Sequence, residues 1–218
     1  MTMEKIDLLE EVKSVAPESP ITGSDDPRIL YLMEKYSLSE EEAFQRFENG
    51  IGEYYKRTYF TKEYGWSVPN EEAIKEIKDF VEDDECLEIG AGYGLWAKLM
   101  QDVGIDIVPT DSFGHRSGWV PEDKSFTYVE DLNSEEALDK YDDANVLMMS
   151  WPPYDNPLAS DAITAFSGGK LISIGECGGC TADSKFFEIL DSQWVNVGNV
   201  QIPQWEGIHD YLSLWVRK

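Results

Sequence analysis

The sequence predicts an α/β fold, in which helices cover both faces of a mostly parallel sheet and a helical extension precedes it. Three observations predict this fold. A short apolar strand stops in a glycine-rich turn that leads into a helix, within residues 86–103. Strand-like apolar runs then alternate with helical patterns toward the C-terminus. One of them, residues 145–150 (NVLMMS), is almost continuously apolar, which is typical of a central parallel strand buried on both faces.

The chain has 218 residues, which suits one α/β domain with an extension better than two full domains. We expect residues 1–69 to form a helical, aromatic-rich extension and cap, and residues 70–218 to form the main domain. Within the extension, the polar residues 16–26 indicate a mobile linker because they contain prolines and a glycine. Six aromatic side chains crowd residues 54–66. They predict a docking surface for the extension, or alternatively a roof over a ligand pocket.

The charge balance is strongly acidic, with 18 Lys and Arg against 43 Asp and Glu and a net charge of −25. Such a field repels phosphate backbones and argues against tightly held DNA or RNA. No apolar run reaches the roughly 18 residues that a membrane span needs, and the N-terminus lacks a signal-peptide pattern. Three cysteines are an odd and small set, which favours a reducing compartment. We therefore expect an acidic cytoplasmic protein without a membrane partner.

Capping residues and apolar periodicity give the order of the elements. Ser39 with Glu42 three residues later predicts a capping box, and Asn70 predicts the N-cap of a helix that runs to Val81. The expected helices cover residues 4–12, 27–35, 39–49, 70–81, 95–103, 134–141, 161–166 and 184–190. The expected strands begin at residue 86 and then cover residues 105–109, 126–129, 145–150 and 170–174, with two closing strands in residues 194–217.

The glycine-rich turn, residues 88–94 (EIGAGYG), predicts a nucleotide pocket at the end of the first strand. Glycine adopts positive φ and has no Cβ, so a ligand can lie against the backbone. The first N–H groups of the next helix point into the same space. Asp111 ends the second strand, where a nucleotide-binding unit places the carboxylate that holds ribose hydroxyls.

Two further motifs follow strands of the sheet. Residues 145–150 lead into the segment 151–154 (WPPY), whose two prolines make a rigid loop at the edge of the sheet. The strand over 170–174 leads into Glu176 and the segment 177–180 (CGGC). A Cys-x-x-Cys pair could bind metal or exchange disulfides, but only His115 and His209 could complete a zinc site. We favour a tight glycine loop and predict no metal site.

These motifs together resemble the class I S-adenosylmethionine (SAM)-dependent methyltransferases, whose first motif reads acidic-x-Gly-x-Gly-x-Gly. The chain also resembles a scattered group of proteins that share its Trp-Pro-Pro, Gly-Glu and Gly-Gly-Cys-Thr stretches. The resemblance implies a Rossmann-like seven-stranded sheet with an antiparallel seventh strand, and SAM as cofactor. At the third strand it implies an acidic residue beside the adenine, for which Asp131 is preferred over Glu130. The implied cofactor residues are Glu88, Gly90, Ala91, Gly92, Asp111, Asp131, Leu132 and Ser150.

The Trp-Pro-Pro-Tyr segment resembles the acceptor motif of amino-group methyltransferases, in which Asp, Asn or Ser precedes Pro-Pro and an aromatic residue. Here Trp151 occupies the polar position and Ser150 comes one residue early. An indole N–H donates a hydrogen bond and cannot accept one. The resemblance implies that Trp151, Pro152 and Tyr154 belong to the active site. Glu176 directly follows a strand that ends at the same edge and is the preferred catalytic candidate for a general base, with Asp155, His209 and Asp210 as the other candidates.

The leading hypothesis is an enzyme that transfers a methyl group from SAM to a small-molecule or protein acceptor. One alternative is a nucleic-acid amino methyltransferase of the N6-adenine type, which Pro-Pro-Tyr favours and Trp151 and the net charge oppose. The other is a non-catalytic acidic binding protein that keeps the fold. The sequence does not indicate the acceptor atom or the oligomeric state.

Overall fold

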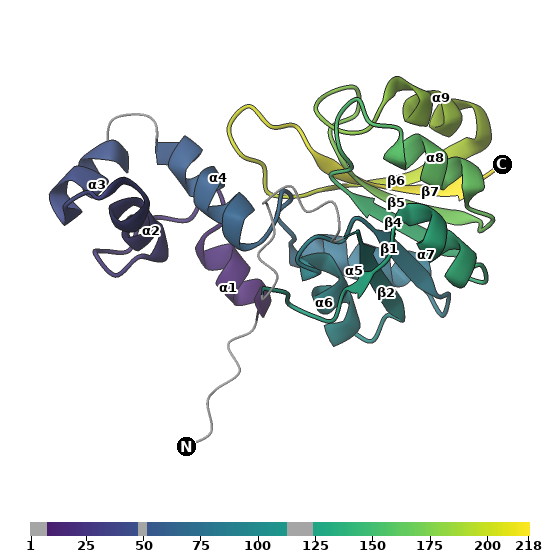
Figure 1. The fold of residues 1–218 in the computed structure, drawn as a ribbon, viewed down its shortest axis with the longest axis horizontal. Coiled ribbons are helices and arrows are strands. Elements are labelled where there is room, and N and C mark those ends of the chain that lie inside the picture. Colours follow the sequence, from purple (N-terminus) through teal and green to yellow (C-terminus); the bar gives the residue numbers. More distant parts are fainter. Residues whose placement is uncertain (1–7, 48–51, 113–123) are drawn as a thin grey trace, which may run out of the picture.

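The computed structural model describes residues 8–47, 52–112 and 124–218. Within these ranges a seven-stranded sheet has the order β3-β2-β1-β4-β5-β7-β6 (Figure 1). The strands β1 to β5 pair in parallel, and β7 lies antiparallel between β5 and β6. The predicted α/β fold with seven strands and a reversed seventh strand is therefore confirmed. The strands are β1 Cys86–Ile89, β2 Ile107–Asp111, β3 Glu130–Asp131, β4 Val146–Ser150, β5 Lys170–Gly175, β6 Trp194–Gln201 and β7 Tyr211–Arg217.

Helices cover both faces of the sheet (Figure 1). One face packs against α5 (Glu71–Val81) and α6 (Leu95–Asp102), and the other against α7 (Ser134–Lys140), α8 (Leu158–Ala165) and α9 (Ser184–Gln193). Because successive strand residues point to opposite faces, β4 contributes to both cores. Its Val146 and Met148 join the first core, and its Leu147 and Met149 join the second. The apolar run of this strand therefore has the predicted burial.

The N-terminal helices extend away from the sheet. In Figure 1, α2 (Pro27–Tyr36) and α3 (Glu40–Arg46) lie farthest from it, while α1 (Leu8–Ser14) and α4 (Gly52–Glu63) lie between. The outer helices share a small core. Val12 of α1 and Phe60 of α4 instead join the core of the α5–α6 face. The extension is thus anchored through α1 and α4, and its boundary at residue 69 stays a prediction.

The structure differs from the sequence analysis of the extension in two respects. The sequence analysis did not predict α4, because the apolar side chains of this helix are mostly tyrosines that form no single stripe. The predicted mobile linker over residues 16–26 is held by Arg28, which is 1% exposed. Its guanidinium donates to the carbonyl oxygens of Ser19 and Pro20 and forms an ion pair with Asp26 at 2.8 Å. The buried Arg28 guanidinium thus donates the hydrogen bonds that hold the backbone of this segment in place.

Two strands lie later in the chain than predicted. The Ile105 N–H donates to the carbonyl of Met100 and so still belongs to the turn after α6, and β2 begins at Ile107. The predicted strand over 126–129 is not a strand, since Phe126 N–H donates to the carbonyl of Tyr93 in the glycine turn. The third strand is reduced to Glu130–Asp131. Predictions for residues 1–7, 48–51 and 113–123 lie outside the described residues.

The remaining elements agree with the sequence predictions to within a few residues, and both predicted caps are present. Ser39 and Glu42 form the capping box of α3, and the Asn70 side chain accepts from Ala73 N–H at 2.8 Å. Of the helices described, none combines the length and the apolar character that crossing a membrane requires.

Candidate functional site

The sheet topology opens a crevice at the carboxyl ends of β1 and β4. These strands are neighbours, but the helices that follow them, α6 and α8, pack on opposite faces. Ligands in open α/β sheets bind where the chain diverges in this way. A cavity of about 540 Å³ lies there. Its volume falls in the range of small-molecule sites.

The glycine turn forms the floor of this cavity. Gly90, Gly92 and Gly94 have φ of 73°, 56° and 71°, in the left-handed region that favours glycine. A Cβ on either of the first two would meet nothing within 4 Å, whereas a Cβ on Gly94 would lie 2.9 Å from the Val129 side chain. The N–H groups of Gly90 and Ala91 donate to the carbonyl of Thr110 and fix the turn against β2. The first two glycines therefore expose backbone to the cavity, and the third permits close packing.

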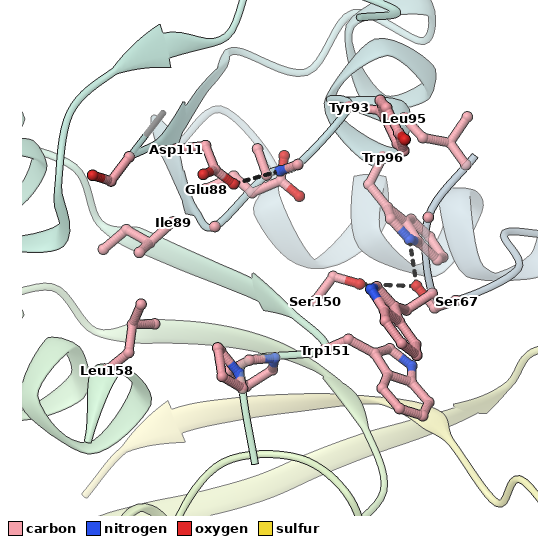
Figure 2. A pocket seen from close by; sticks show the side chains of 18 of the residues that line it. Ser67, Glu88, Ile89, Tyr93, Leu95, Trp96, Asp111, Ser150, Trp151 and Leu158 are labelled. Atoms are coloured by element: carbon pink, nitrogen blue, oxygen red, sulfur yellow. Dashed lines mark hydrogen bonds between the residues drawn. The ribbon is translucent and has the colours of Figure 1, made fainter. Parts of the chain in front are cut away.

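Two carboxylates stand beside the turn (Figure 2). Glu88 on β1 is 1% exposed, and its Oε2 has no hydrogen-bond partner among the described residues. Burial, and secondly the neighbouring charge of Asp111, raises the pKa of Glu88 to about 8. Asp111 accepts from the Gly92 N–H at 2.8 Å. A positively charged ligand group placed here would favour the charged form of Glu88, so a cationic group suits this end of the cavity.

Hydroxyl and indole groups gather at the other end, away from Glu88 and Asp111 (Figure 2). The Oγ atoms of Ser67 and Ser150 are 2.8 Å apart, and Trp96 Nε1 donates to Ser67 Oγ, also at 2.8 Å. The rings of Trp66 and Trp151 stack with centroids 5.7 Å apart. Ser67 and Trp66 follow α4, so the extension supplies part of this wall. Sequence reasoning missed both residues individually, although the aromatic crowding of residues 54–66 pointed to a pocket roof.

Hydrogen bonds fix both the backbone and the indole N–H of Trp151. Its φ is 52°, its backbone N–H donates to the carbonyl of Ile174, and its Nε1 donates to Asp210 Oδ2 at 2.9 Å. Asp210 is 1% exposed, and its Oδ1 has no partner in the described part of the chain. Burial raises the pKa of Asp210 to about 6, although the Trp151 hydrogen bond opposes the rise. Because the indole N–H is engaged, Trp151 offers the cavity only a ring surface.

Most of the predicted site residues lie together around this cavity. The predicted lining residues are Glu88, Gly90, Ala91, Gly92, Asp111, Leu132, Ser150, Trp151 and Pro152. Asp131 is exposed and does not line the cavity, whereas Asn133 and Ser134 beside it do. The competing residue, Glu130, accepts from Lys140 and Tyr141.

Tyr154 and Glu176 lie outside the cavity. Tyr154 is 68% exposed. Glu176 accepts from His209 N–H at 2.7 Å and from Cys180 N–H at 3.3 Å, which ties two loops together. It lines a separate cavity of about 100 Å³. The structure therefore does not bring Glu176 to the main cavity, and Asp155, His209 and Asp210 do not line that cavity either.

The cysteine loop shows no metal-binding geometry. Cys177 and Cys180 are free and exposed. In the part of the chain that the structure describes, no three His, Cys, Asp or Glu side chains gather as metal ligands. His115 lies outside that part.

Comparisons with known proteins give structural neighbours only. No family model matches the chain, and no curated protein matches its sequence. A mutant of MtNAS in complex with S-adenosylmethionine aligns over 98% of this chain and 93% of its own, with 14% identity and a TM-score of 0.49. Magnesium protoporphyrin IX methyltransferase (ChlM) from Synechocystis, with bound SAM, aligns over 90% of this chain and 100% of its own, with 9% identity and a TM-score of 0.46. TehB from Haemophilus influenzae aligns over 74% of this chain and 66% of its own, with 11% identity and a TM-score of 0.44.

Similarities this distant carry no argument about activity.

Proposed function

We propose that this protein binds SAM above the glycine turn and transfers the methyl group to a small-molecule or protein acceptor. One observation carries the proposal: the exposed backbone of Gly90 and Gly92 lies beside the carboxylates of Glu88 and Asp111, at the point where the sheet topology diverges. A Cβ would fill this space, and a buried carboxylate oxygen in it has no partner among the residues that the structure describes.

The residues around the turn fit the parts of SAM. The ammonium and sulfonium groups of the ligand are cationic and suit the acidic end of the cavity. The Asp111 carboxylate can accept hydrogen bonds from two vicinal ribose hydroxyls. Leu132 and Asn133, which follow β3, offer an apolar surface and an amide for the adenine.

When bound, SAM supplies a methyl group on a positively charged sulfur, so that a lone pair of the acceptor forms the new bond to carbon while the S–C bond breaks and leaves a neutral thioether. The protein then has to position the acceptor and exclude water. The rings of Trp66, Trp96 and Trp151 line the cavity and serve both tasks. A general base is needed only for an acceptor that is protonated. Because Glu176 and His209 lie outside the cavity, the geometry favours an acceptor that reacts as a neutral group and loses its proton to water.

Calorimetry with SAM and S-adenosylhomocysteine tests the binding part of the proposal. Transfer of radiolabelled methyl to separate metabolite, protein, RNA and DNA fractions tests the acceptor. We expect saturable binding of both ligands and label in the metabolite or protein fraction. Label confined to RNA or DNA would favour the N6-adenine type of activity. Binding without transfer to any fraction would favour a non-catalytic protein.

A further inference from the structure

Trp151 has an unfavourable backbone conformation. Its φ is 52°, in the left-handed region that a residue with a Cβ rarely adopts, and Pro152 follows it. Contact with the proline ring normally pushes the preceding residue toward an extended conformation. The conformation of Trp151 therefore persists only because its surroundings enforce it, and strain of this kind is typical of functional sites.

Two hydrogen bonds enforce this conformation. The backbone N–H of Trp151 donates to the carbonyl of Ile174 at 2.8 Å, and its indole Nε1 donates to Asp210 Oδ2 at 2.9 Å. Asp210 stands directly before β7 and is 1% exposed. Gln204 Nε2 donates to the backbone carbonyl of Asp210 at 2.6 Å and so fixes that residue in turn. The orientation of the Trp151 ring therefore depends on one buried carboxylate that does not line the cavity.

A cation of the extension lies beside the same ring. The guanidinium carbon of Arg57 in α4 is 5.5 Å from the Trp66 ring and 6.0 Å from the Trp151 ring, within the range of a cation–π interaction. These two rings stack with an angle of 22° between their planes. Arg57 Nε and Asp210 Oδ1 are both buried without a hydrogen-bond partner among the described residues. The two rings are thus held by a cation from the extension and by a carboxylate from the segment before β7.

Charges from other elements act on Asp210. Glu176, which follows β5, disfavours its negative charge, and Arg57 favours it. In the chain, His209 precedes Asp210 and Tyr211 follows it. Burial has the largest effect and raises the pKa of Asp210 to about 6. Asp210 is therefore mostly a carboxylate at pH 7 and takes up a proton in the range just below.

We propose, on the basis of the proposed function, that Asp210 is a positioning residue of the methyl-transfer site, which holds the Trp151 ring against Trp66 through the indole N–H. Asp210 acts through Trp151, because only the tryptophan lines the cavity. A charged carboxylate accepts a stronger hydrogen bond than a neutral carboxyl group. The wall formed by the two rings is therefore held more firmly when Asp210 is ionised than when it is protonated.

Nitrogen-15 NMR of the indole groups tests this contact independently of the reaction. The Trp151 signal is identified by its absence in Trp151→Phe. We expect it to shift with pH in the wild type, with a midpoint near 6, and to stay constant between pH 4.5 and 8 in Asp210→Asn, which keeps an acceptor but does not titrate. Arg57→Met should raise the midpoint by removing a cation, and Glu176→Gln should lower it by removing an anion. A Trp151 signal that is constant in the wild type, or that shifts equally in Asp210→Asn, would overturn the inference.

The initial rate of methyl transfer from radiolabelled SAM into the fraction that takes label tests the role of Asp210 in the reaction. At pH 8, Asp210→Leu should lower this rate at least about tenfold, because leucine has a similar size but accepts no hydrogen bond. Asp210→Asn should stay within about threefold of the wild type, because its amide oxygen still accepts. Asp143→Asn is the matched control, since Asp143 is exposed and does not line the cavity. Equal losses in the leucine and asparagine variants, or no loss in the leucine variant, would overturn the inference.

The affinity for S-adenosylhomocysteine, measured first in every variant, should change less than about twofold if only the Trp151 wall is altered. If Asp210→Leu does not fold and bind this ligand, the NMR comparison of the wild type with Asp210→Asn decides alone. A wild type that neither binds S-adenosylhomocysteine nor transfers label would instead contradict the proposed function, and the indole signals would still decide whether Asp210 holds Trp151.

Discussion

The surroundings of Glu88 are unfavourable to the charged form of its carboxyl group. Its carboxyl group is buried, one of its oxygens has no partner among the described residues, and its pKa rises to about 8 from an ordinary value of 4.5. Between these pH values the folded protein keeps the proton that the unfolded chain releases. Glu88 therefore costs stability progressively as pH rises from about 4.5 to 8. Such a cost at a cavity wall is typical of a group that serves a ligand.

Glu88→Gln should raise the free energy of unfolding at pH 8 relative to the wild type, since it removes a buried carboxylate. The gain should be on the order of 2 kcal/mol or more, because one pKa unit corresponds to about 1.4 kcal/mol. The same variant should bind SAM at least about tenfold more weakly. Urea unfolding at pH 5 and pH 8 measures the stability difference, which should be smaller at pH 5. A wild type as stable as the variant at pH 8 would contradict this account of Glu88.

Single residues were predictable where one local motif determines their place. Strand, turn and helix follow one another within residues 86–103, so the positions of Glu88, Gly90 and Gly92 could be read from the sequence. Glu176 could not be placed in this way. It follows a strand that ends at the same edge of the sheet, but its side chain turns to the N–H groups of Cys180 and His209. The glycine loop predicted over residues 177–180 did not indicate which side chain its N–H groups would bind.

One buried ion pair holds the segment of the extension that precedes α2. Arg28 and Asp26 are each 1% exposed at the side chain, and the pair fixes the segment before α2. Burial alone would raise the pKa of Asp26, but hydrogen bonds from Arg28 and Thr22 outweigh it and lower the pKa to about 2. The stability that the Asp26 carboxylate contributes is therefore present above about pH 4 and lost as pH falls through 2.

Arg28→Ala should lower the free energy of unfolding by about 3–5 kcal/mol at pH 7, because it leaves a buried carboxylate without its cation. Replacing both partners, Asp26→Leu with Arg28→Met, should recover much of that loss. Chemical denaturation of the two variants and the wild type measures both effects. Equal destabilisation of the single and double variants would contradict the assignment of the loss to the unpaired charge.

Most strands and helices of the sheet were predictable because their apolar periodicity is strong, and the fold class followed from their alternation. The ordered conformation of the linker before α2 was not predictable, because it depends on hydrogen bonds from Arg28 to carbonyl groups that lie earlier in the chain. The part of the cavity wall that Trp66 and Ser67 form was not predictable either, since it forms only when the extension packs against the sheet. Sequence patterns report local order well and contacts between distant segments poorly.

The whole molecule carries a net charge of −25, which opposes compactness through self-repulsion. Salt screens such repulsion over about 10 Å at 0.1 M ionic strength. We expect the Tm to rise by several degrees between 20 mM and 500 mM sodium chloride. Differential scanning calorimetry measures the shift. A Tm that stays constant or falls would show that the acidic surface is balanced by local ion pairs.

The central claim for the whole molecule is that the cavity above the glycine turn holds SAM, and two glycines offer a matched pair to test it. Gly92 and Gly104 have φ of 56° and 84°, and a Cβ on either would meet nothing within 4 Å. An alanine at either position costs a similar backbone strain, on the order of 1 kcal/mol. Only Gly92 lines the cavity.

Calorimetric titration of S-adenosylhomocysteine into the wild type, Gly92→Ala and Gly104→Ala is therefore the most direct measurement. The account predicts equal affinity for the wild type and Gly104→Ala, and at least about tenfold weaker binding for Gly92→Ala, because its methyl group enters the space of the ligand. Equal affinity in all three proteins, or no binding by the wild type, would contradict it.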